Sequence, residues 1–185
     1  LVFVNFRSGN VRGDIKSSIY FGGPEGFSKE RRQDLLAWRP IDALTCDLND
    51  NGYADLMFVS SYGYGGADRS EEPGSWVYLN GPDGFQDEPA WRIFVDSAHG
   101  VCCADLNRDG YLDLIFCSID IPDLVIIHGT AEGFDVDNPQ RLRMERDGIV
   151  YDDPRYLCLA DLNNDGWEDL LVANGYITGS DNGDL

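Results

Sequence analysis

Oxygen-bearing side chains alternate with other residues in the segment 105–113 of the sequence. Counted from the first residue of this segment, positions 1, 3, 5 and 9 are Asp105, Asn107, Asp109 and Asp113. Calcium takes about six to eight oxygen ligands, and alternating carboxylate and amide residues in a tight loop supply several of them. Gly110 at position 6 allows the sharp turn, because glycine reaches positive φ without steric cost. The spacing therefore predicts a calcium-binding loop.

The same loop occurs three times at nearly constant spacing. Its first aspartates are Asp47, Asp105 and Asp161, which lie 58 and 56 residues apart (47 to 105 and 105 to 161). A single turn rich in Asp, Asn and Gly needs no metal to explain it. Three copies in phase favour metal binding over ordinary turns. The aspartates at the expected ligand positions are Asp47, Asp55, Asp105, Asp109, Asp113, Asp161, Asp165 and Asp169.

The position of the last carboxylate distinguishes these loops from the helix–loop–helix calcium motif. That motif places a glutamate at position 12, where this chain has Phe58, Phe116 and Val172. Short apolar runs of strand character follow the loops at residues 56–59, 114–116 and 170–172. No segment shows the apolar period of a helix over helical length. We therefore expect calcium loops in an all-β protein with almost no helix.

A second repeated element alternates with the loops, at residues 19–27, 77–85 and 126–134. Each copy reads as a strand, a glycine-rich tight turn and an aromatic residue that opens the next strand, which is typical of a β-hairpin. Each repeat of roughly 57 residues then holds four short antiparallel strands, the content of one β-propeller blade.

Together these motifs resemble the FG-GAP and VCBS-type repeats, which build the calcium-binding β-propeller of integrin α subunits and of many bacterial surface proteins. The resemblance covers essentially the whole chain. It implies calcium ligation by three sets of residues, with position 7 contributing a backbone carbonyl: Asp47, Asn49, Asn51, Tyr53 and Asp55; Asp105, Asn107, Asp109, Tyr111 and Asp113; Asp161, Asn163, Asp165, Trp167 and Asp169. The first loop has Asn51 where the others have aspartate, so its site should bind calcium most weakly.

The repeats predict a single propeller segment over residues 1–185, with approximate units 1–55, 56–113 and 114–169 and a partial strand at 170–185. This makes about three and a quarter repeats, whereas propellers close with roughly four to eight blades. An open arc would expose unpaired strand edges, which promote aggregation. We therefore expect either part of a larger propeller, partnered by further blades, or a chain that closes by association with copies of itself.

Charge and apolar patterning exclude two classes of partner. The formal net charge is −19, which argues against nucleic acid because its phosphates would be repelled. Three calcium ions would bring this charge to −13, and we interpret the remainder as a solvated acidic surface. No apolar run approaches the length of a membrane span, so no membrane insertion is expected.

The five cysteines are Cys46, Cys102, Cys103, Cys117 and Cys158. They form no CxxC pair, and the chain does not read as a disulfide scaffold. Cys102 and Cys158 each lie three residues before the first aspartate of a loop, which suits small buried residues on equivalent core strands. The sequence leaves the redox state of all five open.

Ligand recognition is the function that the resemblance implies. In integrin-like propellers the ligand binds on the face opposite the calcium loops. Connections expected on that face include residues 61–75, 119–123 and 147–155, and the longest offers Tyr62, Tyr64 and Arg69 as contacts for a protein or glycan. Calcium sites of the weaker, extracellular kind fill at about 0.1–1 mM, so we expect an extracellular or cell-surface protein.

Three other interpretations stay open. The tripeptide Arg12-Gly13-Asp14 matches a cell-attachment sequence, although three residues carry little information and a turn-forming Gly-Asp is the simpler account. The two histidines, His99 and His128, have no evident nucleophile with an orienting acid nearby, so no catalytic residues are predicted. The second interpretation is a propeller domain of a polysaccharide-active enzyme, such as a lyase. The third interpretation is a purely structural arc.

Overall fold

The structure is a computed structural model that describes residues 1–6, 14–61, 74–119, 121–175 and 177–178. Throughout this part of the chain the backbone forms β-strands joined by turns and bends, with no helix. The described residues accordingly contain no apolar helix of membrane-spanning length. The predicted all-β class is confirmed.

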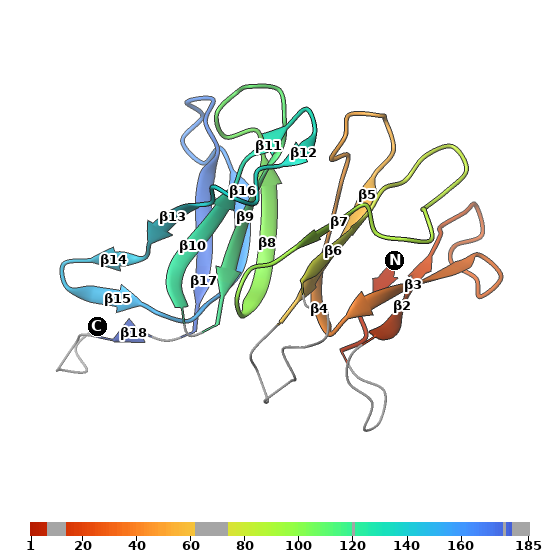
Figure 1. The fold of residues 1–185 in the computed structure, drawn as a ribbon, viewed down its shortest axis with the longest axis horizontal. Coiled ribbons are helices and arrows are strands. Elements are labelled where there is room, and N and C mark those ends of the chain that lie inside the picture. Colours follow the sequence, from red (N-terminus) through yellow and green to blue (C-terminus); the bar gives the residue numbers. More distant parts are fainter. Residues whose placement is uncertain (7–13, 62–73, 120, 176, 179–185) are drawn as a thin grey trace.

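Two four-stranded antiparallel sheets occupy the middle of the molecule (Figure 1). The first has the strand order β4 (Pro40–Cys46), β5 (Asp55–Ser60), β6 (Ser75–Tyr78) and β7 (Trp91–Ile93). The second has the order β8 (Ala98–Ala104), β9 (Asp113–Ser118), β10 (Ile121–Ile127) and β13 (Gln140–Arg143). Each sheet is a meander of four strands, as expected of a propeller blade.

Smaller sheets flank these two. On one side β1 (Val2–Phe3), β2 (Asp14–Tyr20) and β3 (Arg32–Trp38) form a three-stranded sheet. On the other side β16 (Pro154–Ala160) pairs with β17 (Asp169–Asn174), and β16 packs beside β8 as β4 does. The sheets follow one another as an arc, and the described residues do not close into a ring.

Strands β5 and β9 are buried on both faces, and this explains their continuous apolar sequences. Successive side chains of a strand point to opposite faces. Leu56 and Phe58 of β5 therefore pack toward the β1–β3 sheet, while Met57 and Val59 pack toward β8 and β9. In β9, Phe116 packs toward the first sheet and its neighbours pack toward β16 and β17. Three apolar clusters thus join four sheets face to face.

The predicted hairpin turns are present in the first two copies. The amide of Gly26 donates to the carbonyl of Gly23 at 2.9 Å, and that of Gly84 donates to the carbonyl of Gly81 at 3.0 Å. Gly26 and Gly84 have φ angles of 87° and 94°, which a residue with a side chain seldom adopts. In the third copy the turn lies between the short strands β11 (Gly129–Thr130) and β12 (Gly133–Phe134).

One small sheet was not predicted. Strands β14 (Glu145–Arg146), β15 (Ile149–Tyr151) and β18 (Ile177–Thr178) pair in that order. We expected residues 147–155 to form a connection, but β15 and the start of β16 lie within them. This sheet has no apolar alternation long enough to show in the sequence, because its strands are two or three residues long.

The two equivalent cysteines differ in burial. Cys102 is buried, as predicted, between the second sheet and the β16–β17 pair. Cys158 is exposed, so that part of the prediction is wrong. The reason is that Cys158 faces the side of β16 that would contact a following sheet, and the described residues provide none there.

Candidate metal centres

The three predicted calcium loops occupy equivalent places in successive sheets. They span 47–54 between β4 and β5, 105–112 between β8 and β9, and 161–168 between β16 and β17, and all lie along one edge (Figure 1). Each loop is closed by a pair of facing strand residues: Cys46 with Asp55, Ala104 with Asp113, and Ala160 with Asp169. The antiparallel register of each inner strand pair therefore sets where positions 1 and 9 meet.

In the second loop, side-chain oxygens accept hydrogen bonds from backbone amides of the same loop. The two carboxylate oxygens of Asp105 accept hydrogen bonds from the amides of Asp109 and Gly110 at 3.0 and 2.9 Å. The amide of Asp109 also donates to Asn107 Oδ1 at 3.0 Å, and Tyr111 donates to Asp109 Oδ1 at 2.9 Å. Positions 1, 3 and 5 are thus gathered inside one turn by bonds to the backbone of the same loop.

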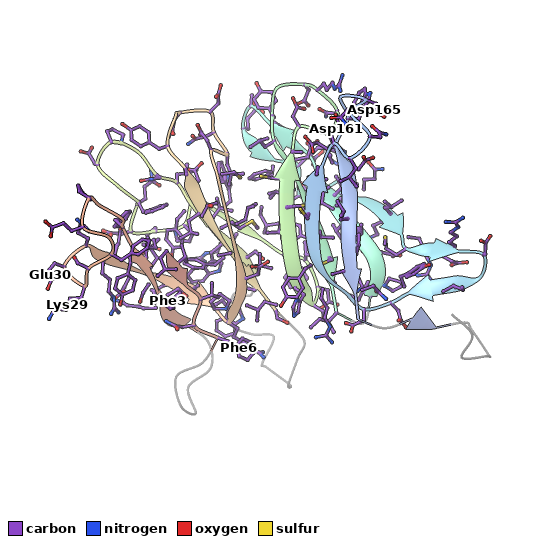
Figure 2. All side chains as sticks on the ribbon, turned by 180° about the vertical axis from the view of Figure 1, so that it is seen from behind. Phe3, Phe6, Lys29, Glu30, Asp161 and Asp165 are labelled. Carbon is purple, nitrogen blue, oxygen red and sulfur yellow. The ribbon has the colours of Figure 1, made fainter. Side chains whose placement is uncertain are left out.

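The first and third loops repeat this arrangement. Asp47 accepts from the amides of Asn51 and Gly52 at 3.0 and 2.7 Å. Asp161 accepts from those of Asp165 and Gly166 at 3.1 and 2.9 Å, and Figure 2 shows Asp161 and Asp165 beside each other in this loop. Three segments of different sequence therefore adopt one hydrogen-bonding pattern.

Position 4 of each loop has a conformation that the sequence analysis missed. Asp50, Arg108 and Asn164 have φ angles of 55°, 60° and 58°. Asn and Asp tolerate this left-handed region better than most residues, so two of the three positions carried a signal. Arg108 carried none. Glycine at position 6, with φ between 85° and 95° in all three loops, is the turn residue that we expected.

The aspartate at position 9 links each loop to its surroundings. Its Oδ2 accepts the amide of the residue at position 2, at 2.9 Å for Asp55 and 3.0 Å for Asp113 and Asp169. In the first two sheets its Oδ1 also accepts an amide from the hairpin element, at 2.7 Å from Asn80 and 2.9 Å from Gly129. This connection between the two repeated motifs was not predicted, because they are 16 to 25 residues apart in sequence.

Burial gives Asp55 an electrostatic cost. Asp55 and Asp113 are both 0% exposed. Burial raises the pKa of Asp55, and the amides of Asn80 and Leu48 offset part of this rise. No basic side chain in the described part of the chain pairs with Asp55, whereas His128 Nδ1 lies 3.1 Å from Asp113 Oδ1. A buried carboxylate without a cationic partner is stabilised when a metal ion supplies the charge.

The donor set fits a hard cation. Each loop offers carboxylate and amide oxygens, which calcium prefers, and an oxygen that accepts one N–H retains a second lone pair. Within the described residues no three His, Cys, Asp or Glu side chains converge into a preformed cage. Asparagine oxygens and backbone carbonyls would therefore have to complete each ligand set. The first loop is the poorest in charge, and its Asn51 directs Nδ2 to the carbonyl of Asn80 at 2.9 Å.

Cavities lie between neighbouring loops. One of about 840 Å³ separates the first loop from the second and is lined by Asp47, Asp105, Trp91 and Glu132 among others. A second, of about 440 Å³, lies between the second and third loops. Arg108 crosses from loop to loop here: its guanidinium stacks 3.3 Å from the ring centroid of Trp167 and donates to the carbonyl of Gly166.

Several residues singled out in the sequence lie outside the described part of the chain. These are Tyr62, Tyr64 and Arg69, the candidate ligand contacts, and Arg12 and Gly13 of the attachment tripeptide, whose third residue Asp14 begins β2. Of the histidines, His99 Nδ1 lies 2.9 Å from the carbonyl of Arg155. His128 contacts the ligand candidate Asp113, which the sequence did not indicate.

Comparison with known proteins gives two matches. Residues 47–116, which contain the first two loops, match the FG-GAP-like repeat. The chain is also 33% identical to mouse (Mus musculus) integrin alpha-7 over 137 residues. That alignment covers 69% of this chain and 11% of the integrin, so the chain spans about a tenth of the length of this relative.

Proposed function

Because this chain is an FG-GAP-like repeat protein with similarity to an integrin alpha subunit, we propose that it is a calcium-stabilised β-propeller module that recognises a protein or glycan ligand. The observation that carries the proposal is the repetition of one loop geometry at three consecutive strand junctions along one edge of the stacked sheets. In this proposal residues 1–185 act as one propeller segment.

Calcium would have a structural role. Its ligands would be the oxygens of positions 1, 3, 5, 7 and 9 in each loop, and its charge would offset the carboxylates that the loop concentrates. The buried Asp55 supports this role, because burial raises its pKa and no described basic group compensates for its charge. A cation at this place would favour the ionised carboxylate and hold the loop closed.

The ligand would bind on the edge opposite the calcium loops. Support comes from the similarity to integrin alpha-7. We propose Tyr62, Tyr64 and Arg69 as contacts within the longest of these connections. Recognition of this kind, with weak calcium sites, fits an extracellular or cell-surface protein and a propeller completed by further blades or by copies of the chain.

The calcium role is tested by thermal unfolding of the purified chain in millimolar calcium and again in excess chelator. Calcium should raise Tm, and magnesium at the same concentration should raise it less, because magnesium demands a stricter geometry and loses water reluctantly. Equal Tm values in calcium and in chelator would contradict the role.

Recognition is tested separately, by screening immobilised glycans and matrix proteins against the folded chain in calcium. Binding to one ligand class that weakens after Tyr62→Ala or Arg69→Ala is the expected result. A matched surface variant, Arg141→Ala on β13, should bind as the parent does. Turnover of a bound polysaccharide would favour the enzyme alternative, and absence of binding by folded, calcium-loaded protein would contradict recognition by this segment.

A further inference from the structure

Two thiols meet between the two four-stranded sheets. Cys46 is the last residue of β4, and Cys103 lies one residue before the end of β8, the neighbouring inner strand. Their Sγ atoms are 2.9 Å apart, although the residues are 57 positions apart in the sequence. Bonded sulfurs are about 2.05 Å apart, so an approach of about 0.9 Å would complete a bond. We propose that Cys46 and Cys103 are a disulfide-forming pair that cross-links the first and second sheets directly beneath their calcium loops.

The alternation of β8 makes this pairing specific. Cys102 and Cys103 are adjacent, so their side chains point to opposite faces of the sheet. Cys102 is buried in the apolar cluster shared with β16 and β17. Cys103 packs instead against the cluster between the two four-stranded sheets, where Leu44 of β4 also lies. Cys103 therefore faces Cys46, and its neighbour faces away from it.

Both thiols are accessible to a small reagent. Cys46 and Cys103 are partly exposed, whereas Cys102 and Cys117 are buried. We therefore expect a low-molecular-weight disulfide to reach the pair without unfolding of the sheets.

The reaction is thiol–disulfide exchange with such a disulfide, for example oxidised glutathione. The sulfur of one cysteine, after loss of its proton, attacks the reagent and displaces one small thiolate, which leaves a mixed disulfide. The second cysteine then displaces the other small thiolate and forms the protein S–S bond. Two protein S–H bonds are lost, and the two electrons and two protons end on two molecules of the small thiol.

The cross-link would join two sheets through covalent bonds, independently of any metal. It would close a long loop and so reduce the conformational freedom of the unfolded chain. The proposal does not depend on calcium binding or ligand recognition, because the expected stabilisation also appears in excess chelator.

The test is to incubate the purified chain with oxidised glutathione, block free thiols by alkylation, and map the disulfides by mass spectrometry. We expect Cys46 to be joined to Cys103. The oxidised protein should unfold about 5–15 °C above the reduced protein in chelator. Cys103→Ser should abolish the link, while Cys102→Ser, which removes the adjacent thiol, should retain it.

Two results would overturn the proposal. One is alkylation of both Cys46 and Cys103 in the wild-type protein after oxidation, while a control thiol such as the exposed Cys158 is consumed. The other is a disulfide from Cys46 to any cysteine except Cys103. An oxidised Tm equal to or below the reduced Tm would overturn the stabilising role of the bond.

Discussion

At the scale of single residues, two residues at the same position of different loops allow the effect of turn geometry to be distinguished from the effect of charge. Asn51 and Asp109 both occupy position 5, and each accepts the amide of position 7, from Tyr53 at 2.8 Å and from Tyr111 at 2.9 Å. Each also has one further side-chain bond, to Asn80 and from Asn107 respectively. The two residues therefore make similar hydrogen bonds within the turn but differ in formal charge.

Substitution of these two residues by alanine should have different effects only when calcium is present. Without calcium, Asn51→Ala and Asp109→Ala should each cost about 1 kcal/mol, the usual net value of a lost hydrogen bond. In millimolar calcium, Asp109→Ala should lower Tm more, because it also removes one of the proposed carboxylate ligands. Thermal unfolding of both variants, with calcium and with chelator, measures the difference. Equal losses in calcium would show that the charge at position 5 binds no cation.

Asp42 of β4 should make stability depend on pH. Burial raises the pKa of this carboxyl, with smaller opposing effects from the amide of Ala43 and from His99. Because the folded pKa lies above the unfolded value, Asp42 opposes folding increasingly as pH rises from about 3.9 through the folded pKa. Asp42→Asn should therefore be more stable than the parent at pH 7.

The stability difference between Asp42→Asn and the parent should shrink as the pH falls below the unfolded pKa of the carboxyl. Chemical unfolding at a series of pH values measures this difference. Comparing Asp42→Asn with the parent at each pH cancels the effects of the other carboxylates, which both proteins share. A difference that stays constant from pH 7 to pH 3 would mean that the substitution acts through packing and that ionisation of Asp42 is not involved.

At the scale of elements, Arg108 joins the second and third loops. Its stack on Trp167 and its bond to Gly166 connect positions 4, 6 and 7 of two loops that belong to different sheets. A cation–π contact at an exposed site contributes about 0.5–1 kcal/mol. Since Trp167 is 53% exposed, the larger estimates for desolvated pairs do not apply.

Arg108→Ala should destabilise the protein by about 1 kcal/mol. A double-mutant cycle with Trp167→Ala should show a coupling free energy of comparable size. Arg141→Ala removes the same charge from β13, which has no part in this contact, and should change stability less. Additive effects of the Arg108 and Trp167 substitutions would contradict the contact.

Elements with a strong local signal were the ones that the sequence predicted. The loops were visible because aspartate, asparagine and glycine recur at fixed spacing, and β5 and β9 were visible because burial on both faces makes them apolar throughout. Contacts between distant segments were not visible. The hydrogen bond from the Asn80 amide to Asp55, the proximity of Cys46 to Cys103 and the contact of His128 with Asp113 all depend on how sheets and hairpins pack.

At the scale of the whole molecule, the fold is stabilised by apolar clusters that lie between neighbouring sheets. Phe58 packs between the β1–β3 sheet and the first four-stranded sheet, and Phe116 packs between the two four-stranded sheets. Both side chains are 0% exposed. Neither cluster belongs to a single sheet. The sheets should therefore unfold together, since each apolar cluster is built from residues of neighbouring sheets.

Phe58→Ala and Phe116→Ala should each cost about 3–5 kcal/mol, the usual loss for a buried aromatic residue. Both variants should keep a single unfolding transition by circular dichroism and by tryptophan fluorescence. Val136→Ala, at a site 49% exposed, should cost far less. Two separate transitions in either variant would show that the sheets are independent units.

The small β14–β15–β18 sheet has a consequence for how the chain can diverge. β14 follows β13, the last strand of the second four-stranded sheet, and β18 follows β17 of the next sheet. β15 pairs through its main chain with β14 and β18, and so links the segments that leave these two sheets. Main-chain hydrogen bonds depend little on side-chain identity. Mutations can therefore accumulate in residues 145–151 without loosening the tie, and among related chains this hairpin should be a place where sequence drifts while the spacing of the sheets is inherited.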